Sequence, residues 1–365
     1  MTLQDKVRAK GYCLGASAYQ LVNSPLDDAE WFLSSVAANG GTMSELFFIF
    51  TWRAGWKNCI YPIVKWEADK DEKTGQVLFD GYEFPIWDIN RFDQVNVKKW
   101  VELFKLFPKY GLTLSLRIHD WCSIKDPFKK RHYPFGGRNI QHQQGLYRGG
   151  MWWYGTEDKD NPYGNPEAPR TISPYYKKLL VKLVDMLSSA GVCDDFRLVL
   201  MSEADYRADE GDSEARRDGK VILWHKFHAR ALRECGVKNS QMVISTSRAL
   251  EKMARWEFMM EIHGINSPER LALMQKETEA FIKPENFFPN GDGPDPYAKG
   301  RRGDAPTKRE PSNTQAKTIG FNLGESKIYS YFTRPADTLG VHKMRANSGT
   351  NYFSALKSMA QGVIR

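Results

Sequence analysis

Eight apolar runs recur along the chain, and segments of helical character follow most of them. The runs are too short for helices and are bounded by polar residues, which is typical of buried parallel strands. Eight strand-then-helix units with nothing left over fit a closed barrel better than an open doubly wound sheet. We therefore expect one α/β domain over residues 1–365 with a (β/α)8 TIM-barrel fold. The expected strands are 12–17, 45–52, 112–119, 198–201, 242–246, 258–263, a seventh that ends within 286–292, and 328–333.

Glycines mark where several of the expected helices end. A glycine directly after the last helical position is a common stop signal, because it adopts the left-handed conformation without steric cost. Residues 311–323 also carry apolar residues at helical spacing. The helices 27–39, 96–110, 174–190 and 220–235 are each followed by such a glycine, at Gly40, Gly111, Gly191 and Gly236.

Three long loops are expected on the C-terminal face of the barrel. They cover residues 53–95, 122–172 and 293–311, and the second is rich in glycine, proline, tryptophan and tyrosine. A loop of that length inside a compact domain is usually functional, for example as a lid or a subsite wall. Trp121 precedes this loop and Trp152 and Trp153 lie in it. Amphipathic rings in such positions suit the faces of sugars or a protein partner.

Composition excludes several classes of protein. Hydrophobic residues make up 41% and charged residues 26%, as in folded globular proteins. The five cysteines are scattered and form no C-x-x-C pair, which argues against a disulfide framework and a zinc ribbon. The first residues lack an apolar signal core, and no segment approaches ~18 continuous apolar residues. We expect no membrane association and, by default, a cytoplasmic location, with an excised domain of a larger protein left open.

The formal net charge of +8 raises the question of an anionic partner. The densest basic runs are residues 129–132 and 299–302, and both fall in expected loops. Solvated loops explain such runs, and so does an acidic polysaccharide. No recognised nucleic-acid-binding motif is present, so we expect no nucleic-acid partner.

Polar and aromatic residues follow the apolar runs where each strand is expected to end. In a (β/α)8 barrel those ends open together onto the active-site face. Each residue alone has a structural explanation: Arg53 as a local ion-pair partner, His263 as a satisfied near-core histidine, Glu261 as a buried ion-pair partner. Their recurrence on one side is harder to explain structurally, because polar burial is costly. The candidates are Arg53, His119, Asp120, Trp121, Ser202, Glu203, Asp205, Glu261, His263, Asp292 and Tyr331.

Short motifs at these positions resemble the clan A glycoside hydrolases of the cellulase-like, family 5 type. The resemblance implies a (β/α)8 barrel that hydrolyses O-glycosidic bonds of an oligo- or polysaccharide with two carboxylates, without a cofactor or metal. Residues 224–236 also resemble the fourth helix of that family. The motifs are Phe-Thr-Trp-Arg53, Leu-Arg-Ile-His119-Asp-Trp, Leu-Met-Ser-Glu203 and Glu-Ile-His263-Gly.

The resemblance implies a role for each candidate. Glu203 would protonate the leaving oxygen and Asp292 would act as nucleophile or general base. The remaining candidates, with Arg53 and the two histidines foremost, would hold the sugar and the carboxylates. Two positions depart from the family: Ser202 stands where the family has asparagine, and Asp292 where it has glutamate.

The shorter aspartate leaves the mechanism open. Retaining enzymes hold their carboxyl groups ~5–5.5 Å apart, whereas inverting enzymes leave ~6.5–9.5 Å for a water. Asp292 could serve in either arrangement, or Glu261 or Glu325 could replace it as the partner of Glu203.

Two other classes of function remain open at this stage. One is a non-catalytic glycan-binding or structural barrel, such as an adhesion or virion module. The other is a metal-dependent barrel isomerase or hydrolase that uses Glu203, Glu261, His263 and Asp292 as ligands. The sequence leaves open the sugar, the linkage, endo or exo action and the oligomeric state.

Overall fold

The structure is a computed structural model of the 365-residue chain. The structure describes the continuous ranges 14–17, 21–49, 60–68, 85–119, 134–135, 173–202, 225–246, 259–262, 287–289 and 321–323. It also describes single helical positions in two further segments, at Leu273, Lys276, Phe353, Leu356, Lys357 and Ala360.

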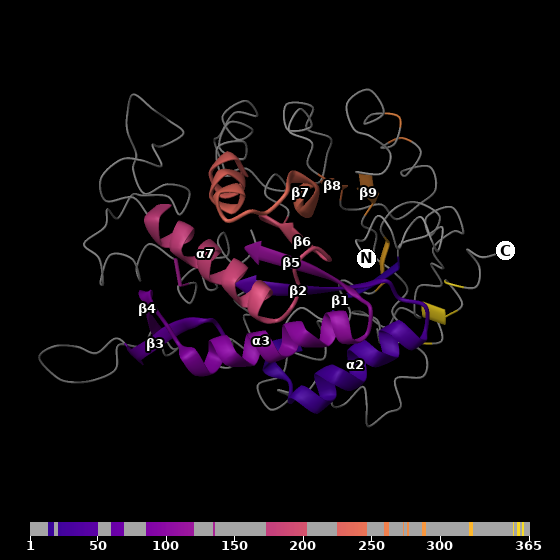
Figure 1. Cartoon of the computed structure of the whole chain (residues 1–365), viewed down its shortest axis with the longest axis horizontal. Helices are drawn as coiled ribbons and strands as arrows, with labels where there is room; N and C mark the ends of the chain where they lie inside the picture. The colour runs from indigo at the N-terminus through magenta and orange to yellow at the C-terminus, as the bar shows by residue number, and fades with distance from the viewer. Residues whose placement is uncertain are drawn as a thin grey trace, which may run out of the picture.

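An eight-stranded sheet, parallel throughout, forms the centre of the described chain (Figure 1). Its strands lie in the order β10-β1-β2-β5-β6-β7-β8-β9: from β1 to β9 each strand of this sheet lies beside its next strand along the chain, and the last strand, β10, lies beside the first, β1. The described pairings run from β10 to β9 and do not include a ladder between those two strands. This order is that of a (β/α)8 barrel and confirms the predicted α/β class. The strands are β1 (Leu14–Ser17), β2 (Met43–Ile49), β5 (Thr113–His119), β6 (Phe196–Val199), β7 (Met242–Thr246), β8 (Met259–Ile262), β9 (Phe287–Pro289) and β10 (Phe321–Leu323).

The eighth strand lies earlier in the chain than the sequence predicted. β10 pairs with β1 through residues 321–323, a segment for which we expected the end of an amphipathic helix. That helix prediction is therefore wrong at its C-terminal end. The strand predicted at 328–333, with Tyr331, lies outside the described residues. A three-residue strand carries too little alternation to be separated from helical spacing, which is the physical reason for the error.

Helices pack on the outside of the sheet, and their ends agree closely with the glycine signals. Gly111 has a φ of 65°, a left-handed value that favours glycine, and Leu112 N donates to Phe107 O at 3.0 Å across the stop. Gly191 closes the next helix in the same way, with a φ of 72°. The helical elements are η1 (Leu21–Asn23), α2 (Leu26–Ala38), α3 (Gln94–Lys109), α7 (Ser173–Ser189), a helix over 225–234, and η3 (Asn239–Gln241).

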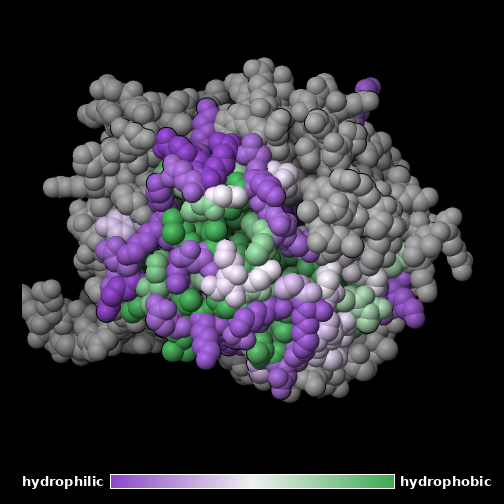
Figure 2. Space-filling model, in the orientation of Figure 1, coloured by the Kyte–Doolittle hydropathy of each residue, from purple (hydrophilic) through white to green (hydrophobic). Residues whose placement is uncertain are grey.

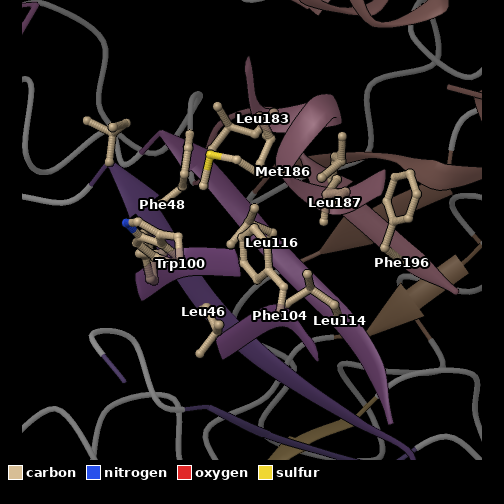
Figure 3. Packing of buried hydrophobic residues seen from close by; sticks show 14 of the residues in the cluster. Leu46, Phe48, Trp100, Phe104, Leu114, Leu116, Leu183, Met186, Leu187 and Phe196 are labelled. Atoms are coloured by element: carbon tan, nitrogen blue, oxygen red, sulfur yellow. The ribbon is translucent and has the colours of Figure 1, made fainter. Parts of the chain in front are cut away.

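Alternate residues of the strands face the helices and form the apolar core. Figure 3 shows this layer, in which the side chains of β2 and β5 meet those of α3 and α7. Trp100 of α3 is central: its ring lies 5.2 Å from the ring of Phe48 and 5.5 Å from that of Phe104. Its neighbours in the layer are Leu46, Leu114, Leu116, Leu183, Met186, Leu187 and Phe196.

The outer helix surfaces are predominantly polar. On the viewed face of the molecule, hydrophilic residues surround a narrower band of apolar ones (Figure 2). Large apolar side chains that are exposed within the described part are Leu26, Val95, Val181 and Leu273, and they come from different elements. No helix of the described part is long and apolar enough to cross a membrane.

A separate two-stranded antiparallel sheet lies inside the segment that we expected to be loop 53–95. β3 (Ile63–Ala68) and β4 (Pro85–Phe92) pair between β2 and α3, so the loop prediction is wrong for these residues. Both strands contain apolar and polar residues in partial alternation, a pattern that is typical of strands. The pair lies at the end of the sheet toward which β2 and β5 point (Figure 1).

The base of this hairpin is bonded to the start of α3. Asp93 caps α3 through bonds from Val95 N and Asn96 N, at 2.9 and 3.0 Å. Asn96 Nδ2 donates to Tyr61 O at 2.9 Å, and Trp100 Nε1 donates to Ile60 O at 3.1 Å. The first turns of α3 therefore hold the strand that enters the hairpin.

Candidate functional site

Three of the predicted site residues fall in the described part of the chain. His119 ends β5, Ser202 follows β6, and Glu261 lies in β8 in register with Ser245 of β7. The structure brings the first two together, because Ser202 N donates to His119 O at 2.9 Å. Only the backbone position of Glu261 is described. Arg53, Asp120, Trp121, Trp152, Trp153, Glu203, Asp205, His263, Asp292 and Tyr331 lie outside the described residues, and their roles stay predictions.

A buried ionic cluster lies among the central strands. Glu45 on β2 is fully buried, and its Oε1 lies 2.9 Å from Nε of Arg117 on β5. Its Oε2 lies 3.7 Å from Nη2 of Arg197 on β6. Both arginines are buried as well. Ionised groups out of water are costly unless they are paired and hydrogen-bonded, so these contacts are a condition for the fold.

The members of the cluster occupy two successive rows across the sheet. In the first row Glu45, Ser115 and Arg197 are register partners on β2, β5 and β6. Arg197 Nε donates to Ser115 Oγ at 2.7 Å, and that hydroxyl in turn donates to Glu45 Oε2 at 3.4 Å. Arg117 lies in the next row toward the carboxyl ends, in register with Phe47.

Arg117 connects this cluster to the ends of two neighbouring strands. Its Nη1 donates to Ser202 Oγ at 2.9 Å and to Ser245 Oγ at 3.2 Å. Its guanidinium carbon also lies 5.6 Å from the ring centroid of Phe47, within the range of cation–π attraction. The buried side chain of Arg117 therefore contacts residues of β2 and β7 and the segment that follows β6. Ser202, in that segment, directly precedes Glu203 in the sequence.

The charged residues of this cluster lie inside the strands and were not predicted from the sequence, because the predicted site residues were taken from the strand ends. The signal was present: Arg117 stands between Leu116 and Ile118, Arg197 stands between Phe196 and Leu198, and Glu45 directly precedes the apolar run 46–50. A lone charged residue within a buried strand indicates an inward-facing, paired group rather than a solvated one. Among the described residues the cluster holds two guanidinium groups and one carboxylate, and Arg117 and Arg197 make further interactions beyond these.

His119 lies in a second buried cluster, which is aromatic. Its ring is edge-on to Tyr176 of α7 at 5.1 Å and to His228 of the 225–234 helix at 5.4 Å. Phe135 completes the group at 6.1 Å. Burial lowers the pKa of His119 well below its ordinary value of 6.5, and the neighbouring His228 lowers it further. Burial also raises the pKa of Tyr176 well above 10. Both side chains are therefore neutral near pH 7, and the predicted substrate contact of His119 would be that of a neutral imidazole.

This histidine makes the stability of the fold sensitive to acid. Because the pKa of His119 is lower when folded, the unfolded chain binds its proton first as the pH falls. The contribution of neutral His119 to the free energy of unfolding is fully present above pH 6.5 and declines below it, by up to about 1.4 kcal/mol per pH unit. The free energy of unfolding, measured with urea at pH 5, 6, 7 and 8, should therefore fall with decreasing pH in the wild type and fall less in His119→Gln. An equal dependence on pH in the two proteins would contradict the assignment.

A metal site requires several ligating side chains that converge on one point. Within the described ranges, no group of three or more His, Cys, Asp or Glu side chains is arranged to hold a metal ion. Of the ligands that the metal-dependent alternative would use, Glu203, His263 and Asp292 lie outside those ranges, and only the backbone of Glu261 is described.

Parallel strands in chain order, with helices packed outside, define the (β/α)8 class of proteins. No family model matches the chain, and no curated protein matches its sequence. Solved structures do match. One of them is a protein from Bacteroides vulgatus ATCC 8482, with a TM-score of 0.50 and 14% identity. The match covers 86% of this chain and spans about half (51%) of that protein.

Three other matches extend over nearly the whole of both chains. A GH5-4 broad specificity endoglucanase from an uncultured bacterium has a TM-score of 0.55 at 8% identity, over 99% of this chain and 96% of that one. ZgEngAGH5_4, solved with a cellotriose, has 0.53 at 10%, over 100% and 98%. The endo-1,4-β-mannanase of Rhizomucor miehei has 0.51 at 10%, over 96% and 95%. The predicted resemblance to family 5 barrels is thus confirmed at the level of the fold.

Proposed function

We propose that this chain is a glycoside hydrolase that cleaves O-glycosidic bonds of an oligo- or polysaccharide. The observation that carries the proposal is the position of Ser202, which follows β6, the fourth strand of the sheet counted from β1. The next residue in the chain is Glu203. Substrates of (β/α)8 enzymes bind at the carboxyl ends of the strands, which is where a catalytic acid is needed. The fold shared with family 5 enzymes supports the same assignment.

Two carboxylates carry the proposed chemistry. Glu203 protonates the oxygen of the leaving sugar, and Asp292 either attacks the anomeric carbon or activates a water for that attack. In the first case the anomeric configuration is retained and in the second it is inverted. Arg53 and His263 hold the carboxylates and the sugar.

A β-linked polysaccharide backbone is the substrate class that we propose. The matched structures include an endoglucanase, a protein with bound cellotriose and an endo-1,4-β-mannanase. Trp121, Trp152 and Trp153 would stack on successive sugar rings, since aromatic faces suit the apolar faces of pyranoses. The net charge of +8 adds acidic glycans to the substrates worth testing.

The proposal is tested by product release from a panel of glycans. Wild type, Glu203→Gln and Glu102→Gln are incubated with cellulose oligomers, xyloglucan, β-mannan and an acidic polysaccharide. The rate of product release by Glu203→Gln should be roughly 100-fold or more below that of wild type, because general acid catalysis contributes about 10²–10⁴-fold. Glu102 lies on the surface of α3 and pairs with Lys105, so its replacement serves as the control for the same chemical change.

Three outcomes separate the alternatives. Equal activity of wild type and Glu203→Gln overturns the assignment of the acid. Glycan binding without any product after long incubation supports the non-catalytic barrel, which the departures at Ser202 and Asp292 favour. Where hydrolysis occurs, proton NMR of the first anomer released distinguishes retention from inversion.

A further inference from the structure

Ser202 is attached to β5 through both its backbone and its side chain. Its N–H donates to the carbonyl of His119 at 2.9 Å, and its hydroxyl oxygen accepts from Arg117 Nη1 at 2.9 Å. The residue is buried, with 3% of its surface exposed. Both contacts come from the last three residues of β5. The position of the residue before Glu203 is therefore set by a neighbouring strand as well as by its own.

Arg117 is itself held in place. Its Nε faces Glu45 Oε1 at 2.9 Å, its guanidinium lies against the ring of Phe47, and the side chain is fully buried. A rigid planar fork of this kind presents its remaining N–H groups in fixed directions. A serine oxygen that accepts such a charged hydrogen bond keeps one O–H to donate elsewhere, and the charge strengthens that donor.

We propose that Arg117 is a positioning residue that acts through Ser202 to fix the end of β6 from which Glu203 extends. The proposal rests on the proposed function for its catalytic consequence. A misplacement of about 1 Å of a catalytic group costs on the order of 100-fold in rate, so a fixed strand end has a large kinetic effect. No part of the resemblance to family 5 assigns this role to an arginine on this strand.

The chain offers a matched control for each half of the contact. Ser245 accepts from the same Nη1 atom at 3.2 Å but lies on β7, so that it does not adjoin Glu203 in the sequence. Arg197 is equally buried and pairs with the same Glu45, but it donates to Ser115. Loss of either control contact disturbs the cluster without releasing Ser202.

The kinetic test is a double-mutant cycle between Arg117→Lys and Ser202→Ala, with Arg197→Lys and Ser245→Ala as controls. Lysine keeps the positive charge beside Glu45 and removes the fork. Each member of the first pair should lower kcat about 10-fold or more, with KM changed less than about 3-fold. In the Ser202→Ala background, Arg117→Lys should add less than about 2-fold, since it acts through a hydroxyl already removed. The kcat of each control variant should stay within about 3-fold of the wild-type value. Ser202→Thr, which keeps a hydroxyl group, should retain most of the kcat that Ser202→Ala loses.

Hydrogen exchange tests the anchoring without any need for catalysis or for the arginine variants to fold. Amide exchange at residues 202–203 should be about 10-fold faster in Ser202→Ala than in wild type or Ser245→Ala. Equal exchange in the two serine variants overturns the proposal, as does full additivity of Arg117→Lys and Ser202→Ala in kcat. An unchanged rate in Glu203→Gln overturns the proposed function separately, and with it the catalytic half of this proposal.

Discussion

Replacement of Glu45 by glutamine is expected to lower the free energy of unfolding by about 3–5 kcal/mol, the range for removing one partner of a buried ion pair. The carboxylate is fully buried and contacts two guanidinium groups, at 2.9 and 3.7 Å. Glutamine keeps the size of the side chain and one acceptor oxygen but removes the charge. Two buried cations then lose the carboxylate that they share.

Urea unfolding followed by circular dichroism measures this change, with the slope on urea used to check that the folded and unfolded states stay comparable. Glu102→Gln is the matched control, because Glu102 pairs with Lys105 on the open surface of α3. An exposed pair of this kind contributes about 0.2–0.5 kcal/mol. A loss below about 1 kcal/mol for Glu45→Gln would show that the cluster is not the buried ionic contact that the structure describes.

Trp100→Ala is expected to destabilise the fold by about 3–5 kcal/mol, the usual cost of removing a large aromatic side chain from a core. The ring contacts Phe48 and Phe104, and its N–H donates to Ile60 O at 3.1 Å. The substitution therefore removes core packing and a bond that holds the strand entering the hairpin. The same unfolding measurement applies, and Val95→Ala on the same helix is the control. Val95 is 77% exposed, so its loss should stay within about 0.5 kcal/mol. A similar small effect at Trp100 would contradict the packing described.

The parts of the fold that sequence reasoning predicted are those with strong local signals. The strand 112–119 and the helix 96–110 combine clear periodicity with a glycine stop, and the structure has β5 at Thr113–His119 and α3 at Gln94–Lys109. The short strand β10 was missed because its three residues gain their identity from pairing with β1. That information lies far away in the chain, where a local pattern does not reach.

The candidate site shows the same division between local and distant information. An apolar run that ends in Ser202 and Glu203 is visible in the sequence, and the structure places Ser202 after the fourth strand. The contact between Arg117 and Ser202 joins residues 85 positions apart and could not be seen from spacing. The buried charged residues inside the strands, Glu45 and Arg197 among them, became recognisable as a paired cluster once the register of β2, β5 and β6 was known.

The hairpin of β3 and β4 has a consequence for how this chain can vary. Its entry is bonded to Asn23, Asn96 and Trp100, and its exit leads straight into the cap of α3 at Asp93. Both ends of the hairpin are thus bonded to residues outside the interval 69–84. We therefore expect the hairpin to accept insertions or deletions in that interval at a small entropic cost. It is the natural place for descendants of this chain to differ in length, and for a laboratory to graft a foreign loop.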